Sequence, residues 1–213
     1  MKSNEFIIES LEEETLDEFS TTDSGIRTAL EKQGYKFLGK GVDQSAYSEP
    51  GTGKVLKIFG TQSNTRGTGG ETLSTDQKMF VTYAKYCMQN ANNPYLPKFD
   101  GFERFVFNDH TYFQIRMEHL SDSGDLGYAV WDIERMVKRI GAKTSQVFSQ
   151  EEKDSWKLLV KKLGIDGTKL LMKTIIHLHA AGKKKGYGFD LHNENVMVRG
   201  DGTPVIVDPW VIW

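Results

Sequence analysis

The sequence has little cysteine, little net charge and no long apolar run, and each shortage excludes a class of protein. The single cysteine among 213 residues, Cys87, cannot form an internal disulfide, and its apolar surroundings predict a buried thiol rather than a reactive one. A formal net charge of -2 gives the chain no general attraction to nucleic acid or anionic lipid. No run of about 18 apolar residues occurs and the N-terminus lacks the apolar core of a secretory signal, so we expect neither a membrane partner nor secretion.

The chain is long enough to bury a core, and an acidic segment precedes that core. Its 213 residues suit one domain or two small lobes that share an interface. The first 24 residues contain a cluster of acidic side chains followed by small polar residues: Glu12, Glu13, Glu14, Asp17, Glu18, Ser20, Thr21 and Thr22. Charge of one sign with few apolar residues is typical of mobile segments. We therefore predict a flexible acidic arm over 1–24.

Residues 25–119 have the pattern of a sheet with few helices. Five stretches of β-branched and aromatic residues predict strands, and two stretches predict helices. The strands are expected at 35–40, 44–49, 54–59, 102–107 and 112–117, and the helices at 25–33 and 75–89. Gly34 ends the first helix, and Ser74 with Gln77 forms a capping box at the start of the second. This order predicts a five-stranded antiparallel sheet with one helix between its third and fourth strands.

Residues 120–213 change to a helical pattern and then to a hairpin. The stretch SDSGD reads as a linker, after which helices are expected at 126–140, 150–163 and 167–181. Two short apolar strands, VMVR and PVIV, follow and turn on Gly200-Asp201-Gly202. The predicted fold class is therefore α+β.

Polar residues that suit phosphate chemistry surround this hairpin. Asp190, Asn195 and Asp208 lie in GFDLHNENVMV and VIVDPW. Pairing of the two strands would bring Asn195 and Asp208 to the same end of the hairpin. Carboxylate and amide oxygens are ligands that Mg²⁺ accepts, and a further carboxylate can orient an attacking hydroxyl. A capping or turn role is the ordinary alternative for Asp190 and Asn195.

The run Asp190-Leu191-His192-Asn193-Glu194-Asn195, followed by a hairpin and VIVDP, resembles the protein-kinase-like superfamily. The likeness is greatest to its aminoglycoside and choline phosphotransferase branch. The resemblance implies a two-lobed protein-kinase-like fold, with the antiparallel sheet in an N-lobe over 25–119 and a truncated, mainly helical C-lobe over 120–213. It also implies that Asp190 is the catalytic base, that Asn195 and Asp208 bind the metal, and that His192 supports the loop.

The resemblance extends upstream to the expected nucleotide site. GKGVDQSAY, with Gly39 and Gly41, is similar to a glycine-rich loop whose backbone approaches phosphates. Lys57 falls where the family places the lysine that contacts those phosphates, and either Glu71 or Asp76 could pair with it, with Glu71 favoured. Met117, Glu118 and Leu120 end the fifth strand and resemble the hinge that binds adenine. The implied cofactors are ATP and Mg²⁺.

Three features depart from the family pattern. Gly188 replaces the usual histidine before the catalytic loop, Pro209 follows the expected metal ligand, and the chain stops at Trp213 without the later acceptor-binding helices. Two main hypotheses remain open. The first is an ATP- and magnesium-dependent phosphotransferase that acts on a hydroxyl of a protein or small molecule, with adenylyl transfer as a variant. The second is a pseudokinase that binds nucleotide without chemistry.

The N-terminus has a separate resemblance. Met1-Lys2 followed by Glu5-Phe6-Ile7 is similar to the capsid-targeting leader of internal head proteins in large tailed bacteriophages, and Ile7-Ile8-Glu9 fits its cleavage site. An acidic amphipathic arm without a targeting role would have a similar sequence pattern. The leader implies a protein packaged in the virion or active in the cytoplasm of an infected host, with the capsid or a host protein as partner. A structural virion component is the third hypothesis.

Overall fold

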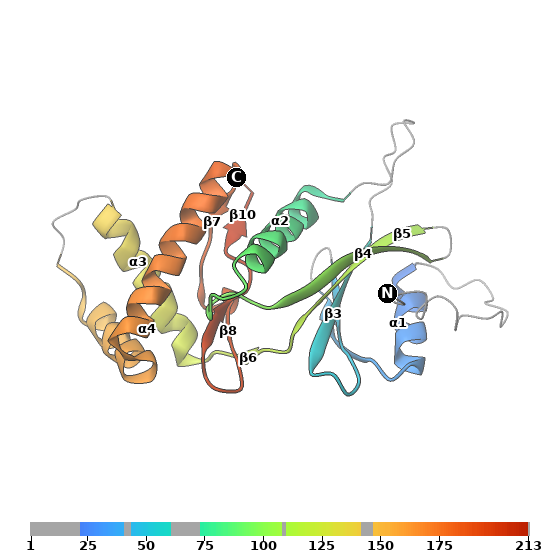
Figure 1. Ribbon diagram of the computed structural model, residues 1–213, viewed down its shortest axis with the longest axis horizontal. Coiled ribbons are helices and arrows are strands. Elements are labelled where there is room, and N and C mark those ends of the chain that lie inside the picture. Colours follow the sequence, from blue (N-terminus) through green and yellow to red (C-terminus); the bar gives the residue numbers. More distant parts are fainter. Residues whose placement is uncertain (1–21, 41–43, 61–72, 108–109, 142–146, 213) are drawn as a thin grey trace.

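A computed structural model gives the structure of residues 22–40, 44–60, 73–107, 110–141 and 147–212. These residues form a mixed α+β fold (Figure 1). In chain order its elements are α1 (Thr22–Lys32), β1 (Lys36–Lys40), β2 (Ser45–Ser48), β3 (Lys54–Gly60), α2 (Thr75–Gln89), β4 (Phe99–Phe107), β5 (His110–Glu118), β6 (Ser121–Asp122), α3 (Asp125–Gly141), α4 (Gln150–Lys184), β7 (Gly188–Phe189), a 3₁₀ turn η1 (Asn193–Asn195), β8 (Val196–Val198), β9 (Pro204–Ile206) and β10 (Trp210–Val211).

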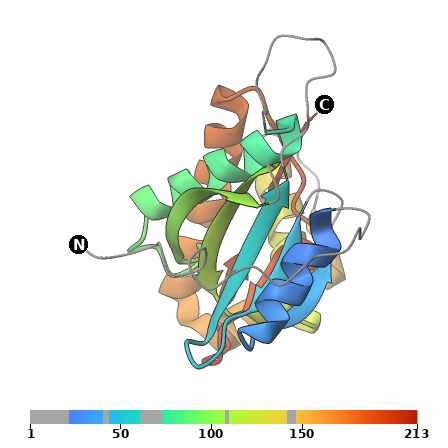
Figure 2. The same ribbon diagram turned by 90° about the vertical axis from the view of Figure 1, so that its right-hand side faces the viewer.

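The largest sheet has five antiparallel strands in the order β1-β2-β3-β5-β4. The predicted five strands and the single helix between the third and fourth are confirmed. Strand β3 buries side chains on both of its faces, because successive residues of a strand point to opposite sides of the sheet. Leu56 and Ile58 pack with α1, whereas Val55 and Phe59 pack with α2 and the main core. Figure 2 shows the sheet with these two helices against it.

The helix boundaries follow the capping signals closely. At the start of α2, Ser74 Oγ accepts from the Gln77 amide at 3.1 Å, and Gln77 Oε1 accepts from the Ser74 amide at 3.0 Å. The predicted capping box is therefore confirmed. Helix α1 begins at Thr22 and overlaps the last three residues of the predicted arm. The arm boundary at residue 24 was wrong because polar residues are tolerated in the first turn of a helix as well as before it.

Helices α3 and α4 pack against each other in the other half of the molecule (Figure 1). The expected helix over 126–140 is confirmed, with one more residue at each end. The two helices expected at 150–163 and 167–181 are joined at a kink, where Gly164 has φ 73°. Positive φ is strained for residues with a Cβ, so the glycine allows the change of direction. Thr168 Oγ1 donates to the Gly164 carbonyl at 2.8 Å and supports the bend.

Three two-residue strands were not predicted. β6 lies in the stretch expected to be a linker, and it pairs with β8. β7 and β10 pair with each other, so that Trp210 lies opposite Phe189. Two residues are too few to create a periodic pattern, so the pairing is decided by tertiary packing.

The two halves share one core. The largest cluster of buried side chains includes Val55 and Phe59 from the sheet, Tyr83 from α2, and Leu171 and Ile206 from the helix-rich half. Trp210 fills the junction: its ring contacts Tyr83 at a centroid distance of 5.3 Å, and its Nε1 donates to the Leu178 carbonyl at 3.0 Å. No helix in the described ranges is long and apolar enough to span a membrane.

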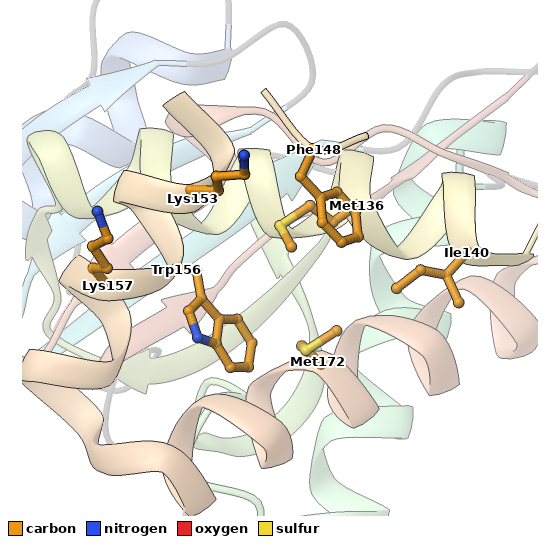
Figure 3. A pocket seen from close by; sticks show the side chains of 7 residues that line it. All are labelled: Met136, Ile140, Phe148, Lys153, Trp156, Lys157 and Met172. Carbon is orange, nitrogen blue, oxygen red and sulfur yellow. The ribbon is translucent and has the colours of Figure 1, made fainter. Parts of the chain in front are cut away.

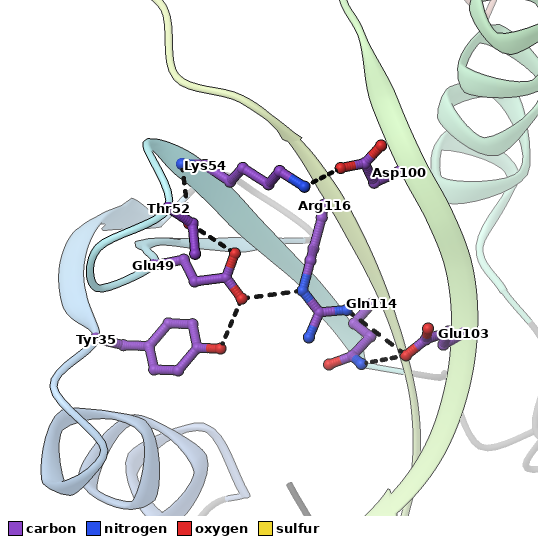
Figure 4. Close-up of polar contacts among 8 residues, drawn as sticks. All are labelled: Tyr35, Glu49, Thr52, Lys54, Asp100, Glu103, Gln114 and Arg116. Carbon is purple, nitrogen blue, oxygen red and sulfur yellow. Dashed lines mark hydrogen bonds and ion pairs between the residues drawn. The ribbon is translucent and has the colours of Figure 1, made fainter. Parts of the chain in front are cut away.

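Arg116, to which the sequence assigned no role, lies in a polar network on the sheet (Figure 4). Its Nε donates to Glu49 Oε1 at 3.1 Å, and its Nη1 lies 3.8 Å from Glu103 Oε2. The Glu49 carboxylate also accepts from Tyr35 Oη at 3.1 Å and Thr52 Oγ1 at 2.8 Å. The network ties the β2–β3 turn to β5 and to the segment after α1.

Candidate functional site

The C-terminal hairpin brings two of the expected site residues together. Val196 pairs with Ile206, and the Val207 amide donates to the Asn195 carbonyl at 2.9 Å. Asn195 and Asp208 therefore lie at the same end of the hairpin, where β8 begins and β9 ends. The pairing is antiparallel, so residues 13 positions apart in the chain become neighbours.

The loop that carries Asp190 is fixed against the same end. The Asp190 amide donates to the Pro209 carbonyl at 2.9 Å, and Asn195 Nδ2 donates to the Asp190 carbonyl at 2.8 Å. Gly188 is buried and pairs with Val211. Two departures from the family pattern, Gly188 and Pro209, thus take part in backbone pairing that holds the loop. The Asp190 side chain itself is exposed.

Lys57 approaches this hairpin from the sheet. In the strand register, Gly39, Ala46, Lys57 and Ile115 form one row across β1, β2, β3 and β5. Members of a row share a face, so the side chain of Lys57 lies on the face that packs against α2. Its Nζ lies 4.6 Å from the centre of the Phe80 ring. Burial lowers the pKa of Lys57, and the negative charge of Asp208 opposes that shift.

Asp208 lies at the centre of the charged groups. Burial raises its pKa, the charges of Lys57 and His192 lower it, and the charges of Asp76 and Asp190 raise it again. The net result is a pKa above the ordinary aspartate value. Lys57 from β3, Asp76 from α2 and Asp190 from the loop before the hairpin are therefore each close enough to act on Asp208. Such crowding of acidic groups favours a bound cation.

A cavity of about 290 Å³ opens between β3, α2 and the hairpin. The described residues that line it are Gln44, Phe59, Asp76, Gln77, Met79, Phe80 and Asp208. The buried Oε1 of Gln44 has no hydrogen-bond partner in the described ranges. Gln77 is held in place because its Nε2 donates to the Gly60 carbonyl at 2.8 Å. A buried polar atom without a partner is costly, so Gln44 marks a position where a polar ligand can bind.

Only part of this lining could be predicted from the sequence. Gln77 was identified for its capping role, but Gln44, Met79 and Phe80 had no signal that pointed to a site. Asp76 lines the cavity together with Asp208, and its charge acts on Asp208. The acid whose charge acts on Lys57 is Asp208 itself. The favoured Glu71 lies outside the described residues, as do Gly41 and the segment before residue 22.

The expected hinge residues have structural partners of their own. The side chains of Met117 and Leu120 are buried in the core, and none of Met117, Glu118 and Leu120 is among the described residues that line the cavity. Glu118 accepts two hydrogen bonds from Arg199, at 2.7 and 2.6 Å, and its amide donates to the Lys98 carbonyl at 3.0 Å. The side chain of Glu118 therefore links β5 to the hairpin.

A magnesium ion would fit the hairpin end only with help from other ligands. In the described part of the chain, no group of three or more His, Cys, Asp and Glu side chains could hold a metal. Asp208 and Asn195 provide one carboxylate and one amide. Mg²⁺ commonly keeps several waters and binds through one or two protein oxygens together with phosphate oxygens. The donor set fits a metal that arrives with a nucleotide.

Comparison with known proteins adds no family assignment. No family model matches the sequence, and no curated protein matches it at a significant level. The function must therefore be argued from the site.

Proposed function

We propose that the chain binds ATP with Mg²⁺ between β3, α2 and the C-terminal hairpin, and transfers the terminal phosphoryl group to a hydroxyl. The proposed fold is a two-lobed kinase-like arrangement, with the five-stranded sheet as N-lobe and the helices and hairpin as a short C-lobe. The observation that carries the proposal is the convergence of Lys57, Asp208 and Asp190 from separate elements. The Asp190 amide donates to the carbonyl of Pro209, the neighbour of Asp208, at 2.9 Å, and the charge of Asp208 acts on Lys57.

Each of these groups has a distinct role in the proposal. Lys57 contacts phosphate oxygens, because a buried ammonium with a lowered pKa gains most from an anionic partner. Asp208 and Asn195 hold Mg²⁺, which neutralises the charge that develops during transfer. Asp190 is exposed and accepts the proton of the attacking hydroxyl. Gln44 lines the cavity, and its amide oxygen, which has no partner among the described residues, lies beside the bound nucleotide.

The assignment of Asp190 is tested by Asp190→Asn. The substitution keeps size and shape but removes the proton acceptor, so we expect turnover of labelled ATP to fall by about 100-fold or more while nucleotide binding is retained. Binding is measured by the rise in melting temperature with ATP and Mg²⁺. Asp201→Asn is the matched control, since Asp201 is an exposed turn residue that accepts from the Thr203 amide at 2.9 Å. Unchanged turnover in Asp190→Asn would refute the role.

A nucleotide-binding module without chemistry is the second candidate. The cavity of about 290 Å³ is at the small end for ligand sites, and the expected hinge residues do not line it. The same two measurements separate the candidates. If ATP and Mg²⁺ stabilise the unmodified protein and no turnover is seen, the binding module is supported. Under both candidates, Lys57→Met should abolish the stabilisation by ATP and Mg²⁺.

The resemblance of residues 1–9 to a capsid-targeting leader stays a separate proposal, and the role as a structural virion component depends on it. It predicts a mature protein cut after Glu9. Intact mass measurement of the chain recovered from virions would detect that cut, and an uncut chain there would contradict it.

A further inference from the structure

A second cavity lies in the helix-rich half, away from the charged site. Its volume is about 480 Å³, and it opens between α3, the residues before α4 and both parts of α4. The described residues that line it are Met136, Ile140, Phe148, Lys153, Trp156, Lys157 and Met172 (Figure 3). None of them belongs to the proposed phosphotransfer site.

The inner wall of this cavity is apolar. Met136 and Met172 come from α3 and the second part of α4, and Trp156 comes from the first part. Figure 3 shows these side chains around one space, with Phe148 and Ile140 beside them. Methionine and tryptophan are suited to flexible apolar ligands, because a thioether adapts its shape and an indole offers a broad flat face. The space has the size and lining of a small-molecule site.

The rim of the cavity is cationic. Lys153 and Lys157 are exposed and lie four residues apart on α4, so their side chains extend from the same helix face. Lys157 Nζ pairs with Asp154 Oδ1 at 2.9 Å, but both side chains are largely exposed and such pairs are weak. A third cation, Arg139, forms an ion pair with Glu152, and its Cζ lies 5.6 Å from the centre of the Phe148 ring.

We propose that this cavity binds a free single-chain fatty carboxylate. The hydrocarbon chain occupies the space between Met136, Trp156 and Met172, and the carboxylate lies between the ammonium groups of Lys153 and Lys157. Burial of the chain supplies most of the affinity, while the charge complementarity at the rim selects an anionic head. A neutral alkane derivative would gain nothing from the lysines, and a cationic amphiphile would be repelled by them.

The test uses decanoate below its micelle concentration, with decanol and decyltrimethylammonium as ligands of different head charge. Calorimetry on the full chain should show one decanoate per chain, and the methyl signals of Met136 and Met172 should shift in NMR spectra while that of Met88 does not. The double variant Lys153→Glu/Lys157→Glu should weaken decanoate binding by about tenfold or more and leave decanol binding within about twofold.

The matched control is Lys169→Glu/Lys173→Glu, which changes the same charge at the same spacing on α4 at exposed positions outside the cavity. It should bind decanoate like the unmodified protein. Ile140→Ser, at a position that is 57% exposed and so does not endanger folding, should weaken both decanoate and decanol. The proposal is overturned if the two double variants bind decanoate equally well, or if decyltrimethylammonium binds as well as decanoate. It is also overturned if the protein binds decanoate only as vesicles, or if sedimentation experiments show a dimer in which a second copy of the chain covers the cavity.

Discussion

At Glu49, three donors from different segments converge on one carboxylate. Tyr35, Thr52 and Arg116 each donate to it, and its side chain is only 13% exposed. Burial raises the pKa of Glu49, but the hydrogen bonds from Thr52, Arg116 and Tyr35, together with the Arg116 charge, outweigh burial and bring the pKa below its ordinary value. The ionised form is therefore the one that the fold stabilises.

We expect Glu49→Gln to destabilise the protein by about 1–2 kcal/mol at neutral pH, because charge-assisted hydrogen bonds are replaced by weaker ones. Because the pKa of Glu49 is lower in the folded than in the unfolded protein, its ionisation adds to the free energy of unfolding above the unfolded pKa of about 4.3. This contribution is lost as the pH falls through the folded pKa. The difference between the two proteins should thus shrink in acid. Urea unfolding at several pH values measures it, with the exposed Glu31→Gln as control; a pH-independent difference would contradict the linkage.

The raised pKa of Asp208 gives a second prediction, which depends on the proposed metal role. Mg²⁺ binds only the ionised carboxylate, so protons compete with it. This competition should begin at a higher pH than for an ordinary aspartate, whose pKa is about 3.9. The apparent affinity for ATP with Mg²⁺ should fall as pH is lowered toward that raised pKa. Calorimetry across pH measures the fall, and Asp208→Asn should bind weakly with little such dependence. An equal slope in both proteins would remove Asp208 from the metal site.

At the scale of elements, the contact between α4 and β10 leaves no space for a side chain. A Cβ on Gly182 would lie 2.7 Å from Trp210 Nε1 and 2.8 Å from Trp210 Cδ1. Trp210 is 4% exposed, and its strand pairs with the strand just before Asp190. The small residue in the helix therefore sets the position of the loop that carries the proposed base.

We expect Gly182→Ala to destabilise the fold by about 1–3 kcal/mol, because the gain in helix propensity is smaller than the cost of displacing a buried indole. Thermal unfolding followed by tryptophan fluorescence measures this change. Gly200→Ala is the control, since a Cβ there would meet nothing within 4 Å. Equal effects of the two substitutions would show that the close contact is unimportant.

Elements with strong local signals could be predicted, and elements formed by packing could not. Alternating residues and the Ser74 capping box located the sheet and α2. Two helical patterns located the two parts of α4, which the structure joins at a kink. β6, β7 and β10 have two residues each and depend on partners far away in the sequence. Within the candidate site, the predicted hairpin correctly placed Asn195 and Asp208 at the same end. Gln44 could not be found, because it stands out only through the burial of an amide oxygen that has no partner in the part of the chain that the structure describes.

At the scale of the whole molecule, the shared core makes the two halves one cooperative unit. Cys87 lies in this core and is 1% exposed, and burial raises the pKa of its thiol to about 12. Reaction with a thiol reagent needs both exposure and ionisation. The reactivity of Cys87 therefore measures how often the core opens.

We expect Cys87 to react with a disulfide reagent only as fast as the protein unfolds, and unfolding curves from fluorescence, circular dichroism and thiol labelling to coincide. Residues 22–119 alone should not fold, because their buried surface against α4 and β9 would be exposed. A fragment with a cooperative transition of its own, or thiol labelling well below the unfolding midpoint, would contradict a single unit.

Arg199 links the C-terminal hairpin to the sheet-rich half. Its guanidinium binds Glu118 at the end of β5 and also donates to the carbonyls of Pro94 and Leu96, with 2.8 Å to the latter. A guanidinium that binds four acceptor atoms on two segments resists the separation of those segments. The hairpin and the end of β5 are therefore held together before any ligand arrives. In the proposed function, the nucleotide meets a site that is already assembled and does not have to spend binding free energy on building it.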